Sequence, residues 1–137
     1  MAVNWQKTPP TEPVGEAKVI AVDDVPSDTR RGGDVRTLMS PKSVGSQSGF
    51  MGVATLAPGD KISEHWHPFS EEFIYVVRGA ITAELNDEAV EVGANHALYV
   101  PFFTRHRLRN EGDEDAFIVF HLGPLAPRAD LGHVDTE

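Results

Sequence analysis

The sequence of 137 residues contains no cysteine. Disulfide bonds and thiolate metal ligands are therefore excluded, and any metal site has to be built from nitrogen and oxygen donors. The absence of disulfides also fits a reducing compartment, which favours a cytoplasmic protein.

Long apolar runs are absent as well. No segment approaches the roughly 20 apolar residues that a membrane-spanning helix requires, and the first residues, MAVNWQKTPPTEP, lack the apolar stretch of a signal peptide. We therefore expect a cytoplasmic protein with no membrane partner. The net charge of -9 also makes nucleic acid an unfavourable partner, because phosphate backbones attract basic surfaces.

The third feature that the chain lacks is a window with helical periodicity. Short runs rich in β-branched and aromatic residues instead alternate with turn signals. Such runs occupy residues 18–22, 35–39, 49–57, 73–77, 80–85, 89–92, 97–100, 105–110 and 116–122. The pattern predicts an all-β fold, and its spacing is typical of a double-sheet jelly roll.

A chain of this length fits one domain. We expect the barrel to cover residues 17–123, after an extended N-terminal arm over residues 1–16 and before a surface-bound C-terminal extension over residues 124–137. Trp5 in the arm is expected either to pack on its own barrel or to cross to a second copy of the chain.

The most informative segment is GDKISEHWHPFSEEFIYVVRG, which begins at Gly59. Side chains at positions i and i+2 of an extended backbone leave the same face, so the imidazoles of His65 and His67 converge. A short break then leads to Glu71 and Glu72, and a strand, turn, strand arrangement returns a carboxylate beside the imidazoles. Imidazole with carboxylate suits zinc, iron, nickel, manganese and copper.

A second group of residues, in VPFFTRHRLRN, makes the pattern more specific. The glycine, histidine, histidine, glutamate and glycine of the first segment resemble the first motif of the cupin superfamily without a gap. Pro101, His106 and Asn110 resemble the second motif, although Asn95 and Phe103 stand where the family has glycines. The resemblance implies a double-stranded β-helix barrel that holds one divalent metal ion. The implied metal ligands are His65, His67, Glu72 and His106.

Longer sequence segments extend this resemblance over nearly the whole chain. RRGGDVRTLMSPKSVGSQSGFMGVATLAPG, EHWHPFSEEFIYVVRG and LGPLAPRADLGHVDTE are similar to the small single-domain cupin polyketide cyclases of actinomycete aromatic (type II) polyketide pathways. This resemblance implies a metal-dependent cyclase that promotes aldol-type ring closure and dehydration of a poly-β-ketone intermediate. The substrate would be carried on an acyl carrier protein, and a homodimer is expected because cupins commonly pair. Zinc is the first choice, because such a reaction needs no redox chemistry.

Two other functions stay open at this stage. Four protein ligands on a six-coordinate cation leave two positions, which accept either a 1,3-dicarbonyl or a substrate oxygen with dioxygen. The second case is a cupin mono- or dioxygenase that acts on an aromatic polyketide. A non-catalytic accessory factor of the synthase complex is the third hypothesis.

His121 and Glu71 are the candidate catalytic residues. If the hairpin that joins the strand AFIVFHL to the previous strand has odd register, His121 faces the same interior as His106. It is then either a general base or a fourth imidazole ligand in place of Glu72. Otherwise it is a core histidine bonded to the backbone. Glu71 is expected behind the ligands or on the surface, and His96 and His133 are expected on the surface.

Alternation along residues 105–110 places His106 on one face and three arginines, Arg105, Arg107 and Arg109, on the other. The arginines either pair with carboxylates or form a basic strip that docks an acidic partner such as the carrier protein. We expect an apolar cavity suited to a flat, ring-forming substrate. Its predicted lining residues are Phe50, Met51, Val53, Ile74, Leu98, Phe102 and Phe103.

Overall fold

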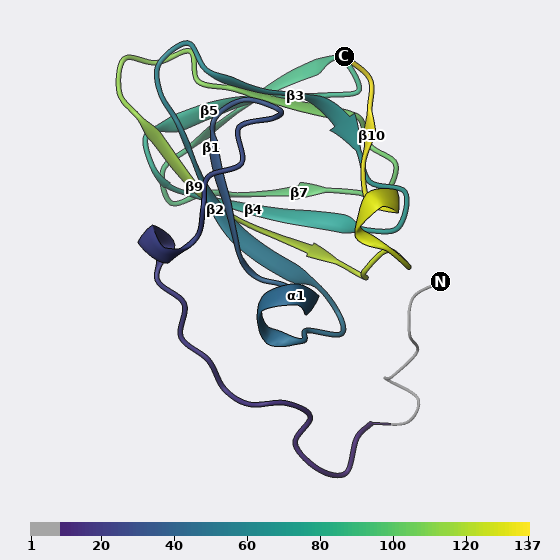
Figure 1. The fold of residues 1–137 in the computed structure, drawn as a ribbon. Coiled ribbons are helices and arrows are strands. Elements are labelled where there is room, and N and C mark those ends of the chain that lie inside the picture. Colours follow the sequence, from purple (N-terminus) through teal and green to yellow (C-terminus); the bar gives the residue numbers. More distant parts are fainter. Residues whose placement is uncertain (1–8) are drawn as a thin grey trace.

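The computed structural model describes residues 9–137 and folds them into two five-stranded antiparallel sheets that face each other (Figure 1). One sheet, the β4 sheet, has the strand order β1-β2-β9-β4-β7, and the other, the β3 sheet, has the order β10-β3-β8-β5-β6. The strands are β1 (Asp34–Met39), β2 (Phe50–Leu56), β3 (Lys61–Trp66), β4 (Glu71–Arg78), β5 (Ala80–Leu85), β6 (Glu88–Gly93), β7 (Ala97–Val100), β8 (His106–Arg109), β9 (Ala116–Gly123) and β10 (Val134–Asp135). The predicted all-β jelly roll is confirmed.

Helical structure is confined to short connections. Within the described residues it consists of α1 (Pro41–Val44) and the 3-10 turns η1 (Val22–Asp24) and η2 (Ala129–Leu131). None of these helices is long and apolar enough to cross a membrane.

The core lies between the two sheets, because side chains alternate across each strand. Along β4, Glu72, Ile74 and Val76 are buried while Phe73 and Tyr75 are exposed. Each fully buried aliphatic side chain contributes about 1.5–3 kcal/mol of hydrophobic stabilisation. The largest such side chains are Leu56, Ile74, Val76, Ile81, Val100 and Ile118.

The turns keep the conformations that the fold needs even where glycine is missing. Asn86 and Asp87 both have positive φ, as in the type I′ turn of a two-residue hairpin. Asn95 and Phe103, which replace the glycines of the family pattern, each adopt a φ of 65°. Asparagine tolerates this conformation well, whereas it strains a phenylalanine. The two turns are therefore as tight as glycines would make them.

The segment before β1 differs from the prediction. Residues 18–22 form no strand, and Val19 is completely exposed. The strand prediction was wrong because these few apolar residues find no neighbouring strand in the barrel. Residues 9–19 are exposed and lead along the outside of the molecule (Figure 1). Trp5 lies outside the described residues, and the boundaries proposed for the arm, barrel and extension remain predictions.

The C-terminal tail returns over the barrel and adds β10 to the edge of the β3 sheet (Figure 1). In this pairing Val134 faces Trp66 and Asp135 faces His65. The Glu137 carboxylate accepts a hydrogen bond from the backbone N–H of Glu64 at 2.6 Å. The tail therefore lies against β3, the strand that carries His65 and leads to His67.

Candidate metal centre

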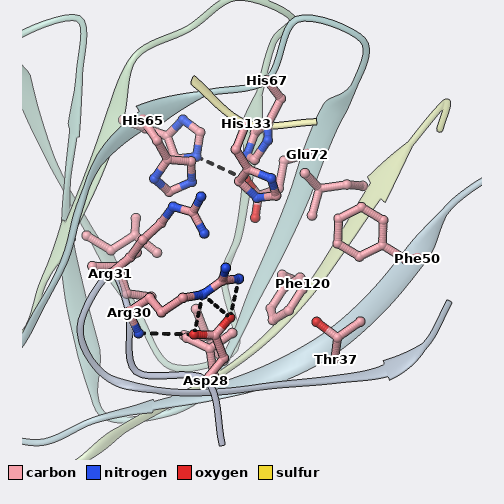
Figure 2. Close-up of a pocket in the computed structure, with 16 residues that line it drawn as sticks. Asp28, Arg30, Arg31, Thr37, Phe50, His65, His67, Glu72, Phe120 and His133 are labelled. Carbon is pink, nitrogen blue, oxygen red and sulfur yellow. Dashed lines mark hydrogen bonds and ion pairs between the residues drawn. The ribbon is translucent and has the colours of Figure 1, made fainter. Parts of the chain in front are cut away.

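The four residues that the resemblance implies as ligands lie close together between the two sheets. His67 forms one group of donor atoms with Glu72 and His106, and it also belongs to another group, which contains His65. His65 and His106 pair directly across β3 and β8, and His67 follows β3 immediately. Glu72 reaches the same place from β4 in the opposite sheet. All four side chains are buried, and Figure 2 shows His65, His67 and Glu72 together at one end of a cavity.

The three imidazoles are oriented by backbone carbonyl groups. The Nδ1 atoms of His65, His67 and His106 lie 2.8, 3.0 and 2.9 Å from carbonyl oxygens of Ser63, Gly132 and Thr104. A carbonyl oxygen only accepts, so each Nδ1 carries the proton and donates it. Each Nε2 is then left with a lone pair, which is the arrangement that metal-binding histidines usually have.

Three of the converging nitrogen and oxygen atoms make no hydrogen bond within the described residues. The Nε2 atoms of His67 and His106 and Oε1 of Glu72 are buried without a hydrogen-bond partner among residues 9–137. Oε1 of Glu72 lies 3.3 Å from Nε2 of His67 and 3.1 Å from Nε2 of His106. Such atoms are costly in a dry interior. A divalent cation would satisfy all three, so this donor set fits a metal ion.

The electrostatics favour the ligand forms of Glu72 and His65. Burial alone would raise the pKa of Glu72, but its contacts with His106 and His67 outweigh this effect and lower the pKa. Burial and the neighbouring His106 ring lower the pKa of His65 to about 4. At neutral pH the carboxylate is therefore charged and His65 is neutral, as metal binding requires.

The cavity beside the four ligands has a volume of about 160 Å³ and mostly apolar walls (Figure 2). Of the predicted lining residues only Phe50 faces it. Met51 and Val53 point to the opposite face of β2, and Phe102 and Phe103 are exposed in the loop before β8. Ile74 and Leu98 belong instead to the packed core between the sheets. The apolar walls are Val35, Phe50, Ile62, Leu108, Ile118, Phe120 and Leu122.

Three polar wall residues of the loop before β1 were not predicted. Asp28, Arg30 and Arg31 line the cavity, with Asp28 and Arg30 at the side away from Glu72 (Figure 2). Arg30 contacts the Asp28 carboxylate at 2.7 Å and lowers the pKa of Asp28 through this hydrogen bond. Arg31 pairs with Asp135 of β10 at 2.7 Å. No local pattern marks these residues, because only the folded loop brings them to the cavity.

His133 is a correction to the sequence interpretation. It was expected on the surface, but it is half-buried and lines the cavity, with its ring 4.6 Å from that of His67. Burial is the largest of the effects that lower its pKa to about 3. The tail shows no strand-like alternation in the sequence, so its return over β3 gave no local signal. His96 is exposed, as predicted.

The two candidate catalytic residues do not reach the cavity. His121 is exposed on the outer face of the β4 sheet, where its ring stacks on Phe73. The interior position required β9 to pair with the strand of His106, but β9 pairs with β2 and β4, and its inward residues include Phe120. Glu71 also faces outward and accepts a hydrogen bond from the Tyr99 hydroxyl.

The three arginines of residues 105–109 face away from the cavity, as alternation predicts, and are paired with carboxylates. Arg107 contacts Glu84 at 2.8 Å and Glu137 at 2.5 Å, and Arg109 also contacts Glu84. Arg105 contacts Glu64 and Asp87. This arrangement favours the ion-pair interpretation over a free basic strip.

Comparison with protein families gives a match to the family described as "Cupin domain" over residues 52–122. The chain belongs to the cupin family. The matched residues include all four potential ligands, His65, His67, Glu72 and His106.

Three relatives of this cupin come from Streptomyces. SchB of Streptomyces halstedii is 57% identical over 122 residues, which cover 89% of this chain and 88% of that protein. The polyketide synthase protein CurC of Streptomyces cyaneus is 52% identical over 120 residues, covering 88% of this chain and 78% of CurC. The resemblance to cupins of polyketide pathways is thereby confirmed.

Among solved structures, the polyketide cyclase RemF from Streptomyces resistomycificus superposes with a TM-score of 0.70. The match covers 89% of this chain and 87% of RemF at 18% identity. At this identity the likeness shows a shared fold, the double-stranded β-helix.

Proposed function

We propose that this cupin is a metal-dependent polyketide cyclase that promotes aldol-type ring closure and dehydration of a poly-β-ketone intermediate in aromatic polyketide biosynthesis. The observation that carries the proposal is the set of converging donors at one end of an apolar cavity. The name of CurC, a close relative, and the activity of RemF, a structural neighbour, support the substrate class.

In this proposal a single divalent cation is held by His65, His67, Glu72 and His106. Their carbonyl-bound Nδ1 atoms fix the imidazoles with Nε2 facing the cation site. Three imidazoles and a carboxylate accept most first-row divalent ions. Zinc is the first choice, because ring closure with loss of water involves no net oxidation, and iron, nickel and manganese suit the same donors.

When bound, the cation supplies Lewis acidity that makes a carbon between two carbonyl groups more acidic. The walls of the cavity position the substrate. Phe50, Phe120 and Ile118 give the folded poly-β-ketone an apolar surface to pack on, which excludes water and brings distant carbons of the substrate together. Arg30 and Arg31 in the cavity wall offer N–H donors to ketone oxygens that the cation does not reach.

The test is a single-turnover assay with the polyketide synthase, its acyl carrier protein and metal-loaded cupin, run with and without oxygen. The proposal predicts a cyclised, dehydrated product in both atmospheres, and loss of this product with His65→Ala or His106→Ala. A product that gains oxygen atoms and forms only in air would instead identify an oxygenase. An unchanged product profile with both variants, but an altered one when the protein is omitted, would identify an accessory factor.

The partners and the location belong to the same proposal. The acyl carrier protein is proposed as the donor of the substrate, although the paired state of Arg105, Arg107 and Arg109 gives no support to docking on that strip. A homodimer and a cytoplasmic location stay predictions. Light scattering in solution and cell fractionation check them.

A further inference from the structure

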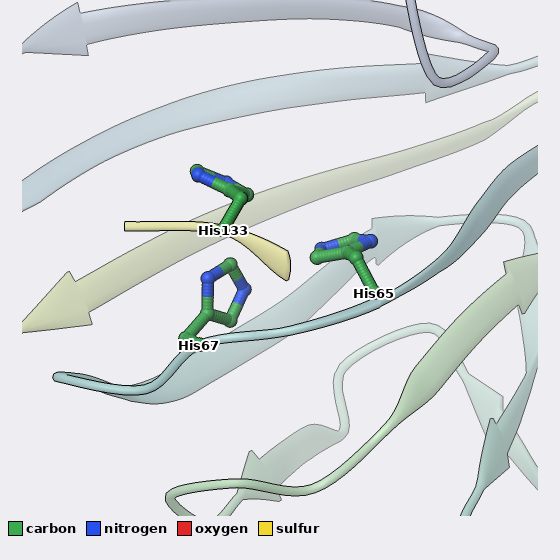
Figure 3. Close-up of side chains that lie close together, drawn as sticks. All are labelled: His65, His67 and His133. Atoms are coloured by element: carbon green, nitrogen blue, oxygen red, sulfur yellow. The ribbon is translucent and has the colours of Figure 1, made fainter. Parts of the chain in front are cut away.

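The C-terminal tail brings a fifth potential ligand to the cavity. The donor atoms of His65, His67 and His133 all lie within 4.8 Å of one another. His67 is also part of the second such group, with Glu72 and His106. Figure 3 shows His133, on the tail, close to His65 and His67 of the β3 segment.

We propose that His133 is a metal ligand, so that the tail supplies an imidazole to the cation held by the barrel. The proposal rests on the metal site of the proposed function, but not on the cyclase chemistry. Two nitrogen ligands at about 2.1 Å from one cation lie no more than about 4.2 Å apart. The donor atoms of His65, His67 and His133 lie within 4.8 Å of one another, so these three reach this geometry through shifts of less than an ångström. His67 links them to the second group, which contains Glu72 and His106.

The tail is held so that His133 stays at the cation site. On one side of it, the Gly132 carbonyl accepts the Nδ1 proton of His67 at 3.0 Å. On the other side, β10 pairs with β3, and the backbone N–H of Thr136 donates to the Glu64 carbonyl at 3.1 Å. The same short segment thus orients one ligand through its backbone and presents a second imidazole beside it.

The His133 ring has no competing partner. Neither of its nitrogens makes a hydrogen bond to another group within residues 9–137. The neighbouring guanidinium of Arg31 would repel a cation, but Asp135 pairs with it at 2.7 Å. The Glu72 carboxylate adds negative charge on the far side of His67. The environment of His133 is therefore suited to coordination.

A fifth protein ligand changes what the tail does. On a six-coordinate cation the four barrel ligands would leave two positions, and His133 would take one of them. A substrate that chelates through two oxygens would then have to displace one protein ligand, and His133, which directly precedes the two-residue edge strand β10, is the candidate.

The experiment is chelator competition with zinc and with cobalt(II) on native protein, His133→Ala and the matched control His121→Ala, whose histidine lies on the outer face. We expect zinc to bind His133→Ala at least about tenfold more weakly, a typical effect for altered metal-site contacts. The absorption bands of bound cobalt(II) should change as well. The control should match native protein in both measurements.

A second measurement uses native protein alone, so that it does not depend on how the variant folds. Addition of zinc should slow amide hydrogen exchange in residues 132–137. Equal zinc affinity for all three proteins would overturn the role of His133 but not the four-ligand site. The same holds if zinc does not change the rate of amide hydrogen exchange in residues 132–137. If native protein binds no zinc or cobalt(II), both this inference and the proposed function fail.

Discussion

The Glu72 carboxylate lies 3.1 Å from Nε2 of His106, which comes from the opposite sheet of the barrel. Oε1 of Glu72 and Nε2 of His106 are both buried without a hydrogen-bond partner among the described residues. A cation bound between them would give both atoms a partner. Their approach also depends on the whole barrel, since β4 and β8 share no ladder. The distance between Glu72 and His106 therefore depends on the correct folding of both sheets.

Glu72→Gln should weaken zinc binding strongly while Glu71→Gln should not. Glu72 supplies the only charged donor of the proposed set, whereas Glu71 points outward to Tyr99. We expect the zinc dissociation constant to rise about 10–100-fold for Glu72→Gln, as measured by chelator competition. Equal affinities for the two variants would contradict the assignment of Glu72.

Gly32→Ala should destabilise the protein far more than Gly59→Ala. Both glycines have positive φ, but a Cβ on Gly32 would lie 1.9 Å from the Lys61 carbonyl oxygen, whereas one on Gly59 meets nothing within 4 Å. Backbone strain alone costs about 1–2 kcal/mol, so this is the expected loss for Gly59→Ala.

For Gly32→Ala the loop that carries Arg30 and Arg31 also has to move off β3. We expect urea denaturation to show a loss of at least about 3 kcal/mol, the upper part of the usual range for single substitutions. Similar losses in the two variants would mean that the loop is not packed against β3.

Glu137→Gln should loosen the tail in a pH-dependent way. Hydrogen bonds from Lys61, the Glu64 backbone and Arg107 lower the pKa of Glu137 from 4.5 to about 2. The carboxylate therefore stabilises the folded state fully above pH 4.5, and this contribution is lost as the pH falls toward 2.

The stability difference between native protein and Glu137→Gln is therefore largest at pH 5 and above, where we expect about 0.5–1 kcal/mol for a partly exposed ion pair. Thermal unfolding at pH 6 and pH 3 checks this, and the gap between the two proteins should narrow at pH 3. A gap that does not depend on pH would show that charge is not what holds the tail.

Asn110→Ala should destabilise the junction of the two sheets. The Asn110 side chain is buried, and its Nδ2 donates to the carbonyl groups of Leu56 and Glu114, each at 2.8 Å. Removing it leaves the buried Leu56 carbonyl group without this partner, which costs about 1–3 kcal/mol. Unfolding in urea measures the loss, and a variant as stable as native protein would contradict these bonds.

Local alternation in the sequence predicted most strands of the barrel and the convergence of His65 and His67. It also placed Glu72 rather than Glu71 inward, since only Glu72 shares a face with Ile74 and Val76. These are the features that period-two patterning determines. That Glu72 and His106 complete the set was implied by the resemblance to the two cupin motifs.

What the sequence could not predict depends on contacts between distant segments. His121 was given an interior option only through a pairing of β9 with β8, and the chain instead places these strands in different sheets. His133 and Arg31 reach the cavity because the tail and the loop before β1 both pack on β3. Neither the tail nor the loop before β1 has a periodic pattern of apolar residues that would predict its packing on β3.

The most direct test of the metal centre is the metal content of native protein and His67→Ala after loading with zinc and removal of the free ion. His67 belongs to both groups of converging donors, so its loss affects each of them. We predict close to one zinc per native chain, the same for the exposed control His96→Ala, and almost none for His67→Ala. Zinc retained equally by His67→Ala, or by no protein at all, would contradict the account.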